Sequence, residues 1–238
     1  AFSAWMTTAT AQSSHQYSLI PFYIFYSMFG FQRIGDLAWA AGDLQSRGFL
    51  MGGTSGRTTL NGEGLQHQDG HSHLLSSAIP NCISYDPCYS YELAVIIHDG
   101  LERMFVNKDP IYYYVTLMNE NYPHPAMPDG AENGIKKGMY LLCSKGKSKK
   151  KMVRLLGSGA ILREVEKAAD LLLEQGVSSQ VWSVTSYIEL ARELRDIDRR
   201  NLLNAEEDYS TSHVGECLEG DQPVIAASDY VKAVPEQL

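Results

Sequence analysis

Hydrophobic and polar positions alternate along the chain with two periods, one typical of strands and the other of helices. Apolar runs of strand length, several of them aromatic or β-branched, predict strands at 19–26, 49–51, 81–85, 111–117, 152–156, 180–185 and 224–227. Apolar residues three or four positions apart predict helices at 31–45, 89–106, 161–174 and 186–194, and residues 1–14 have the composition of the remainder of a helix. Alternating strands and helices assemble into mostly parallel sheets flanked by helices. The pattern therefore predicts the α/β class.

A basic run divides this pattern into two parts. Residues 145–151 contain five lysines, and the alternation of strand and helix starts again after them. We interpret residues 146–151 as a linker or as a turn between two strands, which gives one domain at 1–145 and a second at 152–238. A phosphate or nucleic-acid patch is the alternative, but the acidic remainder of the chain offers no supporting basic face.

Two long loops interrupt the elements, at 52–64 and 119–133, and both contain glycine. Loops of this length within a compact domain are usually functional or disordered. Residues 195–220 are charged and irregular, and no element is predicted there. The turn Gly157-Ser158-Gly159 lacks the third glycine of a dinucleotide fingerprint, so it indicates a close strand-to-helix turn more than an NAD site.

The composition narrows the class of protein. The chain has 238 residues, of which 44% are hydrophobic, and a net charge of −8. The negative charge argues against a general nucleic-acid partner, and no apolar run approaches the roughly 20 residues that span a bilayer. The chain starts at Ala1 inside helix-like sequence, without a leader, so we expect a fragment of a longer protein. Four cysteines without a C-x-x-C pair favour reduced thiols and a cytoplasmic location.

Three histidines with the spacing H-x-x-x-H-x-H, namely His67, His71 and His73, make a zinc site chemically conceivable, with Glu63 and Asp69 nearby. Against this interpretation, one short loop would have to supply nearly all the ligands. The sequence also lacks a metalloenzyme signature such as H-E-x-x-H.

The aromatic segment that follows Pro21 has two interpretations. Dense aromatic residues are expected in a strand of a parallel sheet, because such a strand is buried on both faces. The same residues could instead form a flat apolar slot for a planar ring, with a tyrosine hydroxyl as its polar group. Composition alone favours the first interpretation.

Longer motifs carry a resemblance to a known family. Residues 22–36 and 52–67 read FYIFYSMFGFQRIGD and GGTSGRTTLNGEGLQH, and the likeness continues at 81–87, 98–103, 155–159 and 183–192. Together they resemble the E1 component of the bacterial homodimeric pyruvate dehydrogenase complex. The resemblance is nearly unbroken to about residue 195 and thinner from there to Leu238.

The resemblance implies a transketolase-like enzyme that depends on thiamine diphosphate and Mg²⁺. Residues 1–145 would be its pyrimidine-binding domain, truncated at the N-terminus, and residues 152–238 part of its C-terminal domain. Phe29 would stack on the aminopyrimidine, Tyr26 would lie at the pocket edge and bond the covalent intermediate, and His67 would face the substrate. The implied partners are a second E1 protomer, pyruvate, and the lipoyl domain of the E2 acetyltransferase.

Some family features are missing or altered. The essential glutamate of the family would lie just before Ala1, and the magnesium-binding Gly-Asp-Gly motif does not occur in the sequence. We therefore expect the chain alone not to decarboxylate pyruvate. The family tends to have a Trp and a His-Pro where Arg200 and Asn204-Ala205 stand. Two other interpretations remain open, namely a related thiamine enzyme, such as 2-oxoglutarate dehydrogenase E1 or transketolase, and a non-catalytic remnant that acts in binding or assembly.

Overall fold

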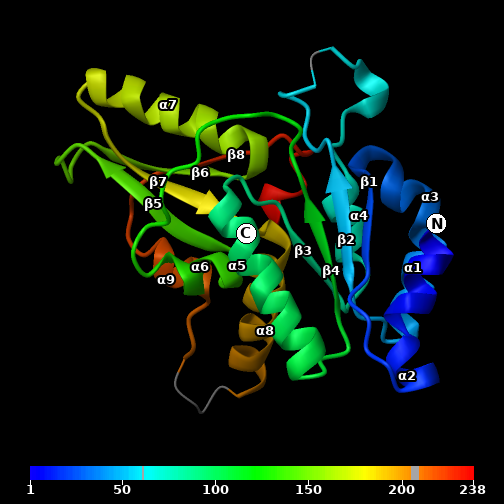
Figure 1. The fold of residues 1–238 in the computed structure, drawn as a ribbon. Helices are drawn as coiled ribbons and strands as arrows, with labels where there is room; N and C mark the ends of the chain where they lie inside the picture. Colours follow the sequence, from blue (N-terminus) through cyan, green and yellow to red (C-terminus); the bar gives the residue numbers. More distant parts are fainter. Residues whose placement is uncertain (61, 205–208) are drawn as a thin grey trace.

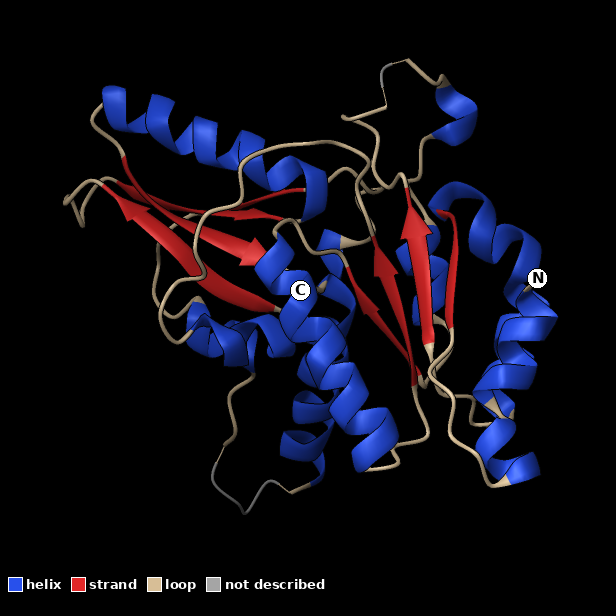
Figure 2. Ribbon diagram, in the orientation of Figure 1, coloured by secondary structure: helices blue, strands red, loops and turns tan. Residues whose placement is uncertain are grey.

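Two four-stranded sheets, each flanked by helices, make up the fold (Figures 1 and 2). The computed structural model describes residues 1–60, 62–204 and 209–238, so Asn61 of the predicted 52–64 loop and Ala205 of the unassigned segment lie outside it. The strand orders are β1-β2-β4-β3 and β5-β7-β6-β8. The predicted α/β class with mostly parallel sheets is confirmed.

The first sheet and its helices are formed by residues before 138. Its elements are α1 (Phe2–Ala9), α2 (Ala11–His15), β1 (Phe22–Tyr26), α3 (Gly30–Asp43), β2 (Phe49–Gly53), α4 (Ser72–Ser77), β3 (Cys82–Tyr85), α5 (Ser90–Leu101), β4 (Tyr112–Thr116) and α6 (Ala131–Lys137). Short helical turns cover Ser27–Phe29 and Leu65–His67, and a π-helical turn, Glu102–Val106, extends α5. Neither α4 nor α6 was predicted from the sequence.

The second sheet follows directly. Its elements are β5 (Met139–Lys145), β6 (Met152–Gly157), α7 (Leu162–Glu174), β7 (Ser178–Val184), α8 (Tyr187–Leu203), α9 (His213–Cys217) and β8 (Val224–Ala227), with short turns at Gly159–Ile161 and Pro235–Gln237. Helix α8 runs well past the predicted end at 194. The strand β5 was not predicted, and it pairs with β7 in antiparallel fashion.

The position of β5 bears on the domain division. Residues 146–151 form the turn between β5 and β6, as one of the two interpretations of the basic run proposed. Because β5 pairs within the second sheet, the lysine run lies inside the second unit and does not separate two units. We propose that the division lies before Met139 and not at 146–151.

All strands of the first sheet are parallel, and both faces of its centre are covered. Leu50, Tyr112 and Tyr114 pack on the side of α1 and α3, whereas Phe49 and Tyr113 pack on the side of α5 and α6. Central strands covered on both faces need apolar residues at nearly every position, which is why β2 and β4 have no polar–apolar alternation.

Strand β1 differs from the central strands because it lies at the edge of the sheet. Phe22, Ile24 and Tyr26 are exposed, the last two by 69% and 48% of their surface. The sequence predicted a fully buried strand here. Only the alternate residues Tyr23 and Phe25 face the core that contains α1 and α3.

Buried polar contacts join the two sheets. The carboxylate of Glu92 in α5 accepts hydrogen bonds from the hydroxyls of Tyr140 in β5, at 2.7 Å, and Ser183 in β7, at 2.6 Å. Arg192 of α8 donates to the carbonyl oxygens of Ile79, at 2.9 Å, and Cys82, at 2.8 Å. The helices of each unit are therefore fastened to strands or loops of the other. No helix in the described ranges has both the length and the apolar content of a membrane span.

Candidate active site

The carboxyl ends of β1, β2, β3 and β4 lie at one edge of the first sheet, because the strands are parallel. In open α/β sheets this edge is where ligands bind. The loop after β2 projects from this edge, at the top of Figure 1, and the connection after β4 crosses from it toward the second sheet. The residues singled out by the resemblance lie on the turns that follow β1 and β2.

A tight turn places the first two of these residues. Strand β1 ends at Tyr26, and the turn Ser27–Phe29 leads directly into α3 at Gly30. A Cβ atom at position 30 would lie 2.0 Å from Cε2 of Phe25, so only glycine lets that ring pack under the start of the helix. The turn thus presents Tyr26 and Phe29 side by side at the carboxyl end of β1.

The loop after β2 carries His67. Positive φ angles at Thr54, Gly56 and Gly64, of 58°, 83° and 73°, let the chain turn sharply before the short helical turn Leu65–His67. The Nδ1 atom of His67 lies 3.2 Å from the carbonyl oxygen of Glu63. A carbonyl only accepts, so Nδ1 carries the hydrogen, and in the neutral ring Nε2 presents its lone pair away from the loop backbone.

The structure brings the three expected residues together. The ring centroids of Phe29 and His67 are 5.4 Å apart with the planes at 78°, and those of Tyr26 and His67 are 5.6 Å apart. Tyr26 and Phe29 are also edge to face, at 6.2 Å. The imidazole therefore contacts both aromatic rings, although it comes from a separate loop.

A hollow of about 290 Å³ lies beside the rings of Tyr26 and Phe29 and is also lined by Arg33, whereas His67 meets these two rings without lining the hollow itself. The guanidinium of Arg33 sits 4.5 Å from the centroid of the Phe29 ring, in the geometry of a cation–π contact. The site therefore offers aromatic surface, the hydroxyls of Tyr23 and Tyr26, the nearby imidazole of His67 and the permanent positive charge of Arg33.

The other two histidines of the cluster do not join His67. His73 is buried at the start of α4, with Nδ1 2.6 Å from the hydroxyl of Ser84 and Nε2 3.0 Å from that of Thr116. Burial lowers the pKa of His73 to about 4, so its ring is neutral near pH 7. Within residues 1–60, 62–204 and 209–238, no group of three His, Cys, Asp or Glu side chains could hold a metal ion. The geometry offers no support for the zinc interpretation.

A buried carboxyl that sequence reasoning missed lies next to His73. The carboxyl of Asp86 accepts from the hydroxyl of Thr116, at 2.6 Å, and from that of Tyr230, at 3.3 Å. Burial raises the pKa of Asp86 to about 7, although these hydrogen bonds oppose the shift. The signal in the sequence was its position, directly after β3 and before Pro87. The contribution of Tyr230 had no such signal, because it comes from the far end of the chain.

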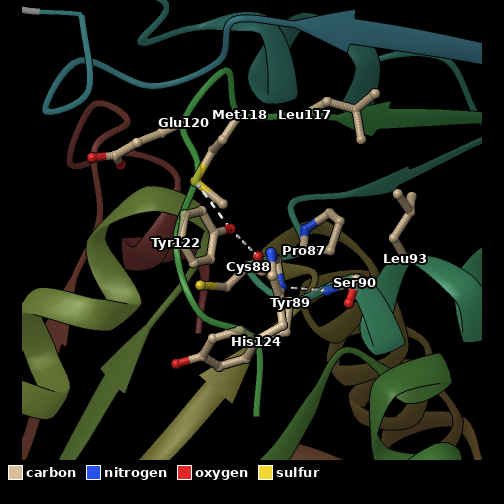
Figure 3. A pocket seen from close by; sticks show the side chains of 10 residues that line it. All are labelled: Pro87, Cys88, Tyr89, Ser90, Leu93, Leu117, Met118, Glu120, Tyr122 and His124. Carbon is tan, nitrogen blue, oxygen red and sulfur yellow. Dashed lines mark hydrogen bonds between the residues drawn. The ribbon is translucent and has the colours of Figure 1, made fainter. Parts of the chain in front are cut away.

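A second hollow of about 220 Å³ opens at the ends of β3 and β4 (Figure 3). The hydroxyl of Tyr122 donates to the carbonyl of Cys88, and Nδ1 of His124 accepts from the amide of Ser90 at 3.0 Å. The rings of Tyr122 and His124 stack at 4.6 Å. The connection after β4 is therefore pinned across this edge of the sheet.

The arrangement of two α/β units is that of known transketolases. The transketolase from Leishmania mexicana matches with a TM-score of 0.65 at 17% identity, over 90% of this chain and 28% of that one. A split-gene transketolase, an inactive β4 tetramer, matches with a TM-score of 0.63 at 16% identity, over 99% of this chain and 75% of that one. The fold defines a transketolase-like α/β protein.

Sequence comparisons go further than the fold. The model of the pyruvate dehydrogenase E1 component middle domain matches residues 1–125, and that of the transketolase-like C-terminal domain matches residues 138–238. The pyruvate dehydrogenase E1 component of Pseudomonas aeruginosa is 58% identical over an alignment of 240 positions, which covers 100% of this chain and 27% of that protein. The Escherichia coli K12 protein is 58% identical over 99% of this chain and 26% of its own length. The chain belongs to the pyruvate dehydrogenase E1 component family and spans about a quarter of the length of these relatives.

Proposed function

We propose that this chain supplies the pyrimidine half of the thiamine diphosphate site in a pyruvate dehydrogenase E1 enzyme. The observation that carries the proposal is the convergence of Tyr26, Phe29 and His67, which come from two separate turns at one edge of the sheet. The overall reaction is the oxidative decarboxylation of pyruvate, with transfer of the acetyl group to a lipoyl group of E2.

The residues fit a planar heterocycle. The hollow of about 290 Å³ beside Phe29 is close to the roughly 300 Å³ at which small-molecule sites begin. In this proposal Phe29 holds the aminopyrimidine by stacking and excludes water from one of its faces. Thiamine diphosphate supplies, when bound, the nucleophilic carbon and the electron sink that decarboxylation of a 2-oxo acid requires.

His67 and Tyr26 provide the polar chemistry in this proposal. Nδ1 of His67 is engaged by the carbonyl of Glu63, which leaves Nε2 for the substrate as far as the described residues show. Nε2 would exchange a proton with the oxygen of the substrate carbonyl, in the role of a general acid or base. The Tyr26 hydroxyl, at the half-exposed edge of the hollow, would donate a hydrogen bond to the same group.

Other parts of the enzyme are needed for turnover. We propose that the magnesium ligands and the diphosphate half of the site lie outside these 238 residues, and that a second E1 protomer and the lipoyl domain of E2 are the partners. The chain on its own is then inactive with pyruvate. We also propose a cytoplasmic location, as the usage of the four cysteines indicated.

The test uses a complete enzyme in which these 238 residues replace the homologous segment of the Escherichia coli relative. We expect His67→Ala to lower kcat/KM for pyruvate by roughly a hundredfold or more, the usual contribution of a general acid or base. Phe29→Ala should raise the thiamine diphosphate concentration needed for half-maximal activity. His71→Ala is the matched control, since within the described residues His71 lacks the ring contacts with Tyr26 and Phe29 that His67 makes, and it should change either quantity less than about twofold. If His67→Ala and Phe29→Ala behaved like the control, the proposal would be wrong.

A further inference from the structure

The loop that carries His67 is closed at its base. The amide of Asp69 donates to the carbonyl oxygen of Gly56 at 3.3 Å, so the chain leaves and returns at the same place. The guanidinium of Arg57 crosses this base and lies 1.9 Å from where a Cβ atom at Gly70 would stand. Residues 56–58 and 69–70 thus form the two ends of the loop, which we call its first and second feet. His67 lies near the second foot.

Three consecutive residues of the second unit contact these feet and the core beneath them. Asp229 binds the first foot through the backbone amides of Arg57 and Thr58, both at 2.9 Å. The amide of Val231 donates to the carbonyl oxygen of Gly70, the second foot, at 3.0 Å.

Tyr230, between these two residues, is the anchor. Its side chain is 6% exposed, its hydroxyl donates to Asp86, and its ring meets that of His73 edge to face at 4.8 Å. Because Tyr230 is held in the core, its neighbours Asp229 and Val231 have fixed positions against the loop. The segment 229–231 follows β8, so the second unit fixes the base of a loop that belongs to the first.

Asp229 is the strongest of these contacts. Its Oδ2 accepts from both amides, and its Oδ1 accepts from the hydroxyl of Thr58 at 2.5 Å. Hydrogen bonds to a charged acceptor are roughly twice as strong as neutral ones. The carboxylate also lies 2.8 Å from where a Cβ atom at Gly56 would stand, so glycine at this left-handed position permits its close approach.

We propose that Asp229 is a positioning residue for His67: it holds the base of the loop so that the imidazole stays against Phe29 and Tyr26. The part of this inference that concerns turnover rests on the proposed function of His67. The part that concerns loop order stands on the contacts alone, and the two parts are measured separately.

Loop order is measured by hydrogen exchange on the 238-residue chain. In Asp229→Ala we expect the amides of Arg57 and Thr58 to exchange roughly ten- to a hundredfold faster, because each loses a charged acceptor. Asp229→Asn keeps one acceptor oxygen and should fall between this variant and the wild type. Asp198→Asn, an exposed carboxyl on α8, is the control and should leave both amides unchanged. Wild-type protection of both amides in Asp229→Ala, or in Asp229→Asn if the first variant does not fold, would overturn the proposal.

Positioning is measured in the complete chimeric enzyme by a double-mutant cycle. Asp229→Ala should lower kcat by roughly tenfold or more when His67 is present and by less than about twofold in a His67→Ala background, since it acts through His67. Partial recovery of kcat in Asp229→Asn is also expected. An equal loss in both backgrounds would mean a merely structural role and would overturn the inference. If His67→Ala alone left kcat unchanged, the proposed function would be wrong. The hydrogen-exchange result would still show whether Asp229 holds the base of the loop.

Discussion

The imidazole of His67 and the ring of Phe29 meet edge to face, with 5.4 Å between their centroids. Each ring is positioned by a different set of contacts, which serves here as its positioning device. Phe29 is set by the close approach of Phe25 to Gly30 at the start of α3. His67 is set by a loop whose base is bound by residues of the second unit. Changes at either device should therefore affect the pair without touching either ring.

A methyl group at Gly30 tests the first device. Gly30→Ala would place its Cβ 2.0 Å from the Phe25 ring, so the helix start or the ring must move. We expect a loss of about 1–3 kcal/mol in the free energy of unfolding, the usual cost of overpacking. Gly35→Ala in the same helix is the control, since nothing lies within 4 Å of its Cβ. It should stabilise the chain by about 0.5–1 kcal/mol through helix propensity. Urea denaturation gives both values, and an equal effect of the two changes would contradict this account.

The buried carboxylate of Glu92 is predicted to stabilise the junction of the two sheets. One oxygen accepts from the amides of Cys88 and Tyr89, and the other from the hydroxyls of Tyr140 and Ser183. Glu92→Leu removes the acceptor of the amides of Cys88 and Tyr89 and of the Ser183 hydroxyl, whereas the Tyr140 hydroxyl keeps its hydrogen bond to Tyr91. It should lower the free energy of unfolding by at least about 3 kcal/mol.

Glu92→Gln is the matched variant. Its carbonyl can still face the two amides, and its NH₂ group can donate to hydroxyls that turn round to accept. We expect it to retain more than half of the stability lost in the leucine variant. Chemical denaturation of both variants measures this, and equal losses would show that charge, not hydrogen-bond geometry, decides.

Stability should depend on pH through Asp86. Its pKa is raised from 3.8 to about 7, so the folded chain binds a proton here that the unfolded chain releases. The contribution of Asp86 is therefore complete below about pH 4 and is lost as the pH rises to about 7. His73 acts oppositely: with its pKa lowered from 6.5 to about 4, it destabilises the fold as the pH falls through that window.

The variant Asp86→Asn separates the two effects, because it keeps an acceptor for Thr116 and does not titrate. As the pH falls from 7 to 4, the wild type should gain stability over this variant by up to about 1.4 kcal/mol per pH unit. Denaturation curves at successive pH values measure the difference. Parallel pH profiles for the two proteins would contradict the raised pKa.

Thiol reactivity should follow burial. Burial raises the pKa of Cys82 to about 12 and also raises that of Cys88, whereas Cys143 and Cys217 are only half-buried. A thiol-specific disulfide reagent at pH 8 should therefore modify at most Cys143 and Cys217 in the folded chain. All four should react in denaturant, since the thiolate is the reactive form. Rapid modification of Cys82 in the native chain, located by mass spectrometry, is the contrary result.

The parts of the fold that followed from the sequence are those where local pattern and tertiary role agree. Strand β4 is β-branched and aromatic throughout, as a strand covered on both faces must be. Helix α7 was predicted at 161–174 and spans Leu162–Glu174, since its apolar residues keep one face. In both cases the residue types alone carry the signal.

The elements that were missed depend on contacts distant in sequence. Helix α6 contains Gly134, whose missing Cβ lets Tyr140 pack against the helix. The helix was not predicted, because a segment that contains glycine and proline is typical of a loop. Strand β5 pairs with β7 in antiparallel fashion. Its own seven residues do not indicate this pairing. Helix α4 places His73 in the core, whereas His67 lies on the loop before it, and the spacing of the histidines does not distinguish the two positions.

The residues of the candidate site also fall into two groups, those expected from the sequence and those found only in the structure. Tyr26, Phe29 and His67 came from a family resemblance, and their convergence is a fact of the structure. Asp86 and Asp229 have their partners at Tyr230 and Thr58, more than a hundred positions away, and pattern analysis has no access to such pairs.

The shared carboxylate of Glu92 has a consequence for how such enzymes are divided among genes. Its four donors come from both halves, so a cut between the halves would leave the carboxylate with the two amides of its own half and separate it from the hydroxyls of Tyr140 and Ser183. The split-gene transketolase chain that matches 99% of these residues in fold keeps the counterparts of both sheets in a single polypeptide. A protein that received either half alone would have to supply new hydrogen-bond partners, either for the carboxylate of Glu92 or for the hydroxyls of Tyr140 and Ser183.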